Sequence, residues 1–167
     1  MERRTVLKTA LGAVLALNLG QIAVSAGEKE MDDKSKASLD TVMAYMGAMG
    51  SGDMDKMGKL MADDMVWHNE GDKTLPWIGG SKGKEAIFKF LAVFSKNLKT
   101  TLWENTDAFA SGDTVAVFGK MNGITPKSGK EIGEFTFALR AKVRDGQVIL
   151  WHWYEDSFAV SQAYHGK

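Results

Sequence analysis

The chain has 167 residues, of which 44% are hydrophobic and 25% charged, and its formal net charge is zero. These proportions are typical of one globular domain with a real core, and the balanced charge argues against a general nucleic-acid surface. The sequence contains no cysteine, which excludes disulfides, thiolate chemistry and cysteine-ligated metal centres.

The N-terminal segment is typical of an export signal. Arg3 and Arg4 precede an apolar run at 9–24, which is short for a membrane span. Small residues precede a cleavage point after Ala26, so we expect a signal peptide at 1–26 and a periplasmic or secreted mature chain without a stable membrane span. The arginine pair resembles a twin-arginine signal, and an ordinary Sec signal is the alternative.

A charged segment at 27–37 is expected to be loose, and one domain is expected at 38–164. The first half of this domain has helical periodicity, broken by one short strand at 65–69. The expected helices lie at 38–49, after the N-cap residue Asp53, and at 84–96. From Lys99 onward the period shifts to two, which is typical of strands. These strands are expected at 100–105, 114–123, 133–143 and 148–155, with a last helical turn at 158–164.

Helices followed by hairpin-connected strands predict an α+β domain, in which the helices cover one face of a curved antiparallel sheet. The last strand has an unusual composition. Alternation places Trp151, Trp153 and Glu155 on one face. A carboxylate in line with two indoles indicates the wall of a pocket. The strand at 65–69 repeats aromatic, imidazole and amide groups, so the two strands together predict an enclosed apolar site for a small molecule.

The order of four short strings is similar to that of the nuclear transport factor 2-like superfamily, in its SnoaL-like branch. The strings are Gly52-Asp53-Met54-Asp55, Asp63-Asp64-Met65-Val66-Trp67-His68, Gly80-Ser81-Lys82-Gly83-Lys84-Glu85-Ala86-Ile87 and Arg144-Asp145-Gly146-Gln147-Val148. The resemblance implies a cone, in which the curved sheet wraps around the N-terminal helices and encloses a pocket. It also implies relatives that include ketosteroid isomerases, polyketide cyclases and epoxide hydrolases, and sheet-to-sheet homodimers. The fold alone does not choose among these activities.

The epoxide hydrolase constellation is largely missing. Asn69 matches the asparagine of those enzymes, but Trp67 replaces their tyrosine and Trp153 falls where their aspartate belongs. Their arginine and aspartate would fall near Gly119 and Met121. The sequence therefore does not support epoxide hydrolysis.

A cyclase or isomerase would need a general base in an apolar pocket. Glu155 is the candidate base, Asp156 is the alternative if a bulge shifts the strand, and His68 or Asn69 would be the polarising donor. The candidate ligand contacts are Trp67, Asn69, Trp77, Trp151 and Trp153, since indoles stack on flat or hydrophobic molecules. Each of these residues has an ordinary structural role as its alternative.

The three histidines form no recognisable metal motif, and the methionines fall at core spacing, so no metal and no cofactor are expected. The sequence thus predicts an exported domain that binds a small hydrophobic molecule. One alternative is a lyase, isomerase or cyclase acting on a carbonyl compound through a pocket carboxylate. A second is a non-catalytic dimerisation module.

Overall fold

The computed structural model describes residues 31–167, so the expected export signal at 1–26 lies outside the described residues. The elements follow the expected order, with helices first and strands after them. They are α1 (Asp33–Ser51), α2 (Met54–Leu60), β1 (Met61–Asn69), β2 (Gly79–Lys82), α3 (Lys84–Asn97), β3 (Lys99–Ser111), β4 (Thr114–Thr125), β5 (Lys130–Glu131), β6 (Phe135–Arg144), β7 (Gln147–Glu155) and α4 (Ser157–Tyr164).

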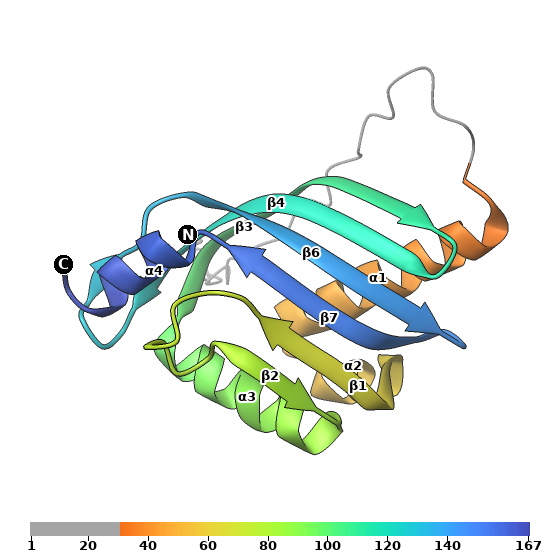
Figure 1. Cartoon of the computed structure of the whole chain (residues 1–167), viewed down its shortest axis with the longest axis horizontal. Helices are drawn as coiled ribbons and strands as arrows, with labels where there is room; N and C mark the ends of the chain where they lie inside the picture. Colours follow the sequence, from red (N-terminus) through yellow and green to blue (C-terminus); the bar gives the residue numbers. More distant parts are fainter. Residues whose placement is uncertain (1–30) are drawn as a thin grey trace, which may run out of the picture.

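Six strands form one curved sheet in the order β2-β1-β7-β6-β4-β3, and β5 pairs with β4 at one end (Figure 1). The pairing is antiparallel except between β1 and β7, which run parallel. The sheet is mainly antiparallel, as expected from the sequence, and the parallel pair is the exception that makes β1 and β7 neighbours. It brings Trp67 into register with Trp151, and Asn69 into register with Trp153.

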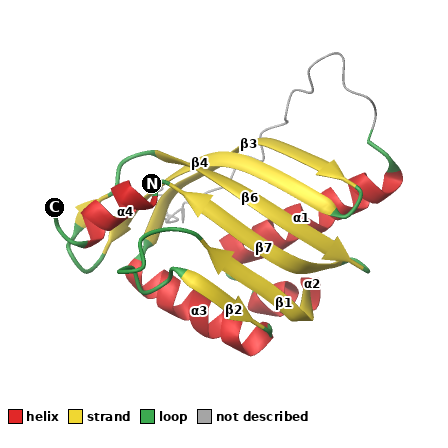
Figure 2. Cartoon of the chain, in the orientation of Figure 1, coloured by secondary structure: helices red, strands yellow, loops and turns green. Residues whose placement is uncertain are grey.

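Helices α1, α2 and α3 lie on one face of the sheet, which we call the helix-covered face (Figure 2). Alternate side chains of β1, β4, β6 and β7 point into it and form the core with the helices. They include Met65, Trp67, Val115, Val117, Phe135, Phe137, Leu139, Trp151 and Trp153. The opposite surface, which carries His68, His152, Tyr154 and Phe118, is called the open face.

Helix α1 begins at Asp33, within the segment that the sequence predicts to be loose. Asp32 caps the helix, because its side chain accepts a hydrogen bond from the Ser35 backbone N–H at 2.8 Å. The Ser35 hydroxyl accepts from the Gly112 N–H at 2.9 Å, and the Ser38 hydroxyl donates to the Gly112 carbonyl at 2.8 Å. Contacts with the distant β3–β4 turn therefore hold the first turn of α1 in place.

Candidate functional site: an aromatic interior with one buried carboxyl

Trp67 and Trp151 converge under the sheet, as the sequence predicts. Their rings stack with centroids 5.1 Å apart at 25°. Tyr45 of α1 packs on Trp151 at 5.1 Å, and Phe90 of α3 packs on Trp67 at 5.4 Å. Trp151 and Tyr45 are both 0% exposed, so this part of the interior is closed to solvent.

A second aromatic group continues the interior toward the end of β7. Trp153 stacks on Phe137 with centroids 4.5 Å apart and on Trp103 with centroids 5.5 Å apart. A Cβ atom at position 119 of β4 would collide with the Phe137 ring and the Glu104 carbonyl. Gly119 therefore leaves the space in which this stack sits.

Glu155 has its carboxyl at this end of the interior. The Trp153 indole N–H donates to Glu155 Oε2 at 2.8 Å, whereas Oε1 is buried and has no hydrogen-bond partner. Burial raises the pKa of the Glu155 carboxyl, and this effect outweighs the Trp153 hydrogen bond, which lowers it. One carboxyl oxygen is thus held in place and the other is left free.

Asn69 links the first strand to the loop that follows it. Its side-chain oxygen accepts from the Trp67 indole N–H at 2.7 Å, and its amide donates to the Trp77 carbonyl at 3.3 Å. The Trp77 ring meets Tyr164 of α4 and Phe94 of α3 edge-on. Asn69 therefore holds the Trp67 indole and the backbone at Trp77, two of the expected ligand-contacting residues.

Buried polar atoms without a partner mark this interior. Among the described residues, four buried side-chain atoms make no hydrogen bond: Tyr45 Oη, Trp77 Nε1, Trp151 Nε1 and Glu155 Oε1. All four belong to residues that line the aromatic interior. Such atoms are uncommon in native proteins, because an unsatisfied buried donor or acceptor costs about 1–3 kcal/mol.

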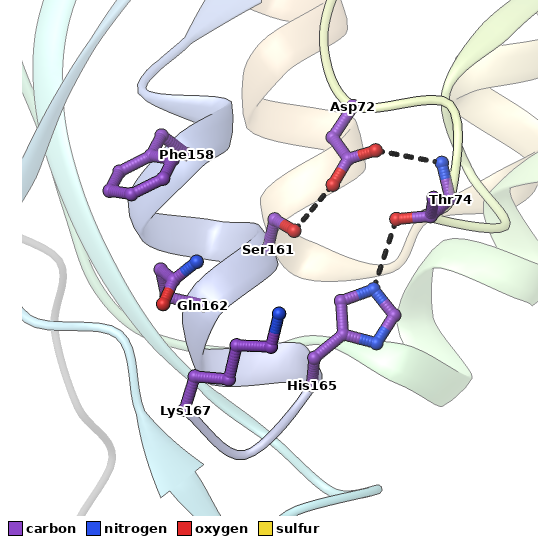
Figure 3. A pocket seen from close by; sticks show the side chains of 7 residues that line it. All are labelled: Asp72, Thr74, Phe158, Ser161, Gln162, His165 and Lys167. Carbon is purple, nitrogen blue, oxygen red and sulfur yellow. Dashed lines mark hydrogen bonds between the residues drawn. The ribbon is translucent and has the colours of Figure 1, made fainter.

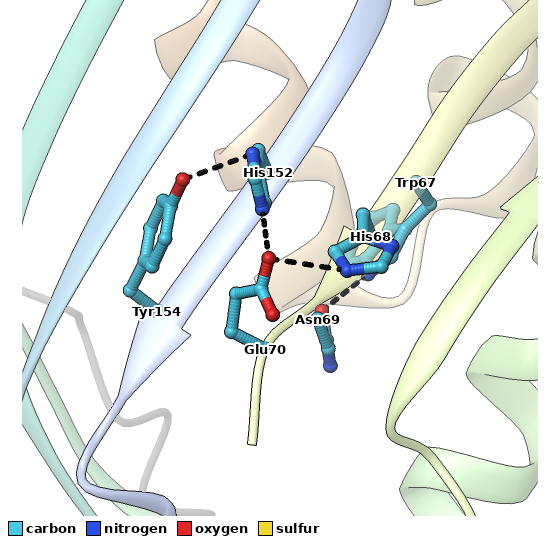
Figure 4. Close-up of polar contacts among 6 residues, drawn as sticks. All are labelled: Trp67, His68, Asn69, Glu70, His152 and Tyr154. Atoms are coloured by element: carbon cyan, nitrogen blue, oxygen red, sulfur yellow. Dashed lines mark hydrogen bonds and ion pairs between the residues drawn. The ribbon is translucent and has the colours of Figure 1, made fainter.

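The structure does not bring Asp156 and His68 to this interior. The Asp156 side chain caps α4 by accepting from the Ala159 N–H at 3.1 Å, and strand alternation turns His68 to the open face, away from Trp67 (Figure 4). Glu155 is thus the one of the three candidate catalytic groups that lies beside the stacked indoles.

On the open face, His68 and His152 meet around a single carboxylate (Figure 4). Glu70 Oε1 lies 3.2 Å from His68 Nε2 and 2.9 Å from His152 Nε2. The hydrogen bond from His152 is the main reason why the pKa of the Glu70 carboxyl is below its ordinary value. The Tyr154 hydroxyl lies 3.0 Å from His152 Nδ1.

A surface depression of about 540 Å³ lies between α4 and the loop after β1 (Figure 3). Its polar groups bond to one another: Ser161 donates to Asp72, and Thr74 contacts His165 Nε2 at 3.0 Å. The Ser161 hydrogen bond is the main cause that lowers the pKa of the Asp72 carboxyl to about 2. These contacts tie the loop to α4, and they use the polar side chains of Asp72, Thr74, Ser161 and His165 within the protein itself.

The curved sheet, covered on one face by helices, has the NTF2-like fold. A family model for the SnoaL-like domain matches residues 42–151, so the chain belongs to the SnoaL-like family. No match was found among curated protein sequences.

Several solved structures share the fold. An NTF2-like protein of Burkholderia xenovorans LB400 is 24% identical with a TM-score of 0.72, over 78% of this chain and 97% of that chain. A Jannaschia sp. CCS1 protein, named for SnoaL-like polyketide cyclases, is 18% identical with a TM-score of 0.70, over 84% of this chain and 99% of that chain. TerC, crystallised with polyporic acid, is 20% identical with a TM-score of 0.69, over 77% of this chain and 98% of that chain.

Sequence reasoning missed three contributors to the interior: Tyr45, Trp103 and Phe137. Tyr45 falls among the core positions of a helix, and Trp103 and Phe137 are aromatic residues on strands, so nothing local separates them from ordinary core. The sheet order β7-β6-β4-β3 brings Trp103 and Phe137 to Trp153, and the packing of α1 on the sheet brings Tyr45 to Trp151.

Proposed function

We propose that this is an exported SnoaL-like protein whose aromatic interior binds a small hydrophobic molecule with a polar group. The observation that carries the proposal is the set of four buried polar atoms without partners among stacked rings. Flat rings provide the apolar contact, and a hydroxyl, two indole N–H groups and a carboxyl oxygen provide directional bonds to the ligand. TerC, which shares the fold, was crystallised with polyporic acid, and this supports a small-molecule role.

Entry of a ligand requires part of the packing to open, and α3 is the wall best suited to move. Ile87 is the only fully buried residue of α3, although Phe90 and Phe94 of this helix cover Trp67 and Trp77. Because its other core-facing side chains, Phe88, Phe90, Leu91 and Phe94, are only partly buried, α3 costs less to displace than the core strands. Displacement of α3 would expose the Trp67–Trp151 stack to an incoming molecule.

Native mass spectrometry of the protein purified from its export compartment tests the proposal. We expect a retained small molecule, one per chain, that is lost when the protein is denatured. The same measurement reports the mature N-terminus, which we expect at Gly27, and the number of subunits. The proposal is wrong if the protein carries no adduct and if its tryptophan fluorescence responds to no member of a panel of aromatic and carbonyl compounds. The remaining candidate function would then be a non-catalytic dimerisation module.

The second candidate function is a lyase, isomerase or cyclase acting on a carbonyl compound, and Glu155 favours it. Because Trp153 holds Oε2, Oε1 is free to take a proton from the carbon beside a substrate carbonyl. The electron pair of the broken C–H bond moves to the carbonyl oxygen, and Glu155 then returns the proton to another carbon of the substrate. A carboxylate whose pKa is raised by burial is the stronger base for this step.

Glu155→Gln and Asp156→Asn form the matched pair for this second candidate. Both variants remove one carboxyl and keep its shape, but only Glu155 has a carboxyl oxygen in the interior. We expect Glu155→Gln to abolish turnover and retain the ligand, and Asp156→Asn to leave both unchanged. An unmutated protein that turns over none of the carbonyl compounds it binds would favour the binding function instead.

A homodimer through the β3–β4 part of the open face is part of the proposal. Phe109 and Phe118 lie side by side there, at 48% and 42% exposure, with ring centroids 6.4 Å apart. Exposed aromatic pairs of this kind are stabilised by a covering partner. Sedimentation analysis should give a dimer that Phe118→Glu dissociates, and a monomeric parent protein would contradict this part of the proposal.

None of the helices in residues 31–167 is long and apolar enough to span a membrane.

A further inference from the structure

We propose that His68, Glu70 and His152 form a binding site for a divalent transition-metal ion on the open face, separate from the aromatic interior. The ligand atoms of these three residues lie within 4.8 Å of one another. Two imidazole nitrogens and one carboxylate oxygen are a donor set that suits Zn²⁺ and the neighbouring first-row divalent ions, whereas Ca²⁺ and Mg²⁺ prefer oxygen ligands alone.

Strand pairing supplies the framework for the site. His68 and His152 are direct partners in the parallel β1–β7 pair, so their side chains leave the same face of the sheet side by side. Glu70 follows two residues after His68, and its backbone N–H donates to the Trp153 carbonyl at 3.0 Å. All three ligands therefore stand on backbone that is fixed by hydrogen bonds between two strands.

The distances fit a metal ion with little rearrangement. Metal–ligand bonds of about 2.1 Å place neighbouring ligand atoms about 3.0–3.4 Å apart in octahedral or tetrahedral geometry. Glu70 Oε1 already lies 3.2 Å from His68 Nε2 and 2.9 Å from His152 Nε2. The ligand nitrogens of the two histidines lie within 4.8 Å of each other, so a bound ion requires this separation to shorten by no more than about 1.8 Å.

Tyr154 orients His152 for this role. Its hydroxyl contacts His152 Nδ1 at 3.0 Å, which leaves Nε2 directed at Glu70 (Figure 4). A hydroxyl both donates and accepts, so the bond persists when a metal takes the Nε2 lone pair and the proton resides on Nδ1. Partners of this kind fix the orientation of ligating histidines in metal sites.

Three protein ligands leave at least one coordination position for water or another small ligand. The exposure of the Glu70 and His68 side chains, 51% and 39%, makes that position accessible from solvent. The proposal revises the expectation from the sequence that the chain holds no metal. His68 and His152 are far apart in the sequence, so no spacing motif could reveal the site.

Titration calorimetry with Zn²⁺ tests the site on the EDTA-treated protein prepared without a polyhistidine tag. We expect one Zn²⁺ per chain. His68→Ala and His152→Ala should each weaken Zn²⁺ binding by at least about 100-fold, because loss of a hydrogen-bond partner of a metal ligand already costs up to about 100-fold in affinity. His165→Ala is the matched control, because His165 is the remaining histidine of the chain and bonds to Thr74 instead. It should bind Zn²⁺ as the parent protein does.

Co²⁺ provides a second readout, because its visible absorption reports the ligands of the bound ion. Glu70→Gln should change the Co²⁺ spectrum, and Tyr154→Phe should weaken Zn²⁺ binding by about tenfold, with the near-ultraviolet circular dichroism of the metal-free protein unchanged. The proposal is overturned if the parent protein binds no Zn²⁺ saturably, or if the His68→Ala, His152→Ala double variant binds it as tightly as the parent.

Discussion

Tyr45→Phe tests most directly whether the buried polar atoms of the interior lack hydrogen-bond partners. Tyr45 is 0% exposed, its hydroxyl has no hydrogen-bond partner, and its ring packs on Trp151. The substitution removes the hydroxyl and keeps the ring. Burial also raises the pKa of the Tyr45 phenol, so the hydroxyl is buried in its neutral form.

The expected result is a gain in stability. An unsatisfied buried hydroxyl costs about 1–3 kcal/mol of stability. Its removal recovers this cost, but the small void left by the missing oxygen cancels part of the gain. We therefore expect the free energy of unfolding of the ligand-free protein to rise by about 1–2 kcal/mol. For a domain of this size the melting temperature should then rise by about 2–8 °C.

The assay is urea and thermal unfolding, followed by tryptophan fluorescence, of protein that has been unfolded and refolded to remove any bound molecule. Tyr154→Phe is the matched control, because its hydroxyl is on the open face and contacts His152. That control should be neutral or lose up to about 1.5 kcal/mol. If Tyr45→Phe instead lowers the free energy of unfolding, the Tyr45 hydroxyl has a hydrogen-bond partner in solution and the argument from unsatisfied atoms fails.

Three further predictions concern the interior and the cap of the neighbouring helix α4. Glu155→Gln should be more stable than the parent at pH 8 but not at pH 4. Burial raises the folded-state pKa of the Glu155 carboxyl above its ordinary value of 4.5, so the stability that the protonated carboxyl contributes is lost as the pH rises through that folded pKa. A difference in unfolding free energy between variant and parent that is constant with pH would contradict this. Asp156→Ala should cost about 1 kcal/mol of stability through loss of the α4 cap, whereas Asp156→Asn should not, and equal losses in denaturant titrations would refute the capping role. Gly119→Ala should lower the melting temperature and change the tryptophan circular dichroism, because the added Cβ displaces Phe137. Gly47→Ala is the control, because a Cβ there meets nothing within 4 Å, and it should be neutral or stabilising by up to about 1 kcal/mol. An unchanged melting temperature in Gly119→Ala would show that the aromatic stack can accommodate the extra methyl group.

The sequence predicts the order of the helices and long strands, because this order follows from local rules. Helical and two-residue periods identify the helices and long strands, and the Asp53 side chain caps α2 as expected, accepting from the Lys56 N–H at 2.9 Å. The missed strand β2 consists of Gly79–Lys82, which has no apolar alternation. It becomes a strand only because β1 offers an edge to pair with.

The sequence by itself determined the SnoaL-like α+β architecture and placed Trp151, Trp153 and Glu155 on one face, since side-chain alternation in a strand is a local property. Only the tertiary structure decided which strand lies beside β7. The parallel pairing with β1 joins residues that are distant in the chain, and it places Trp67 on Trp151 in the interior and His68 beside His152 on the open face. Such non-local pairing depends on the packing of the whole core, and local sequence patterns do not encode it.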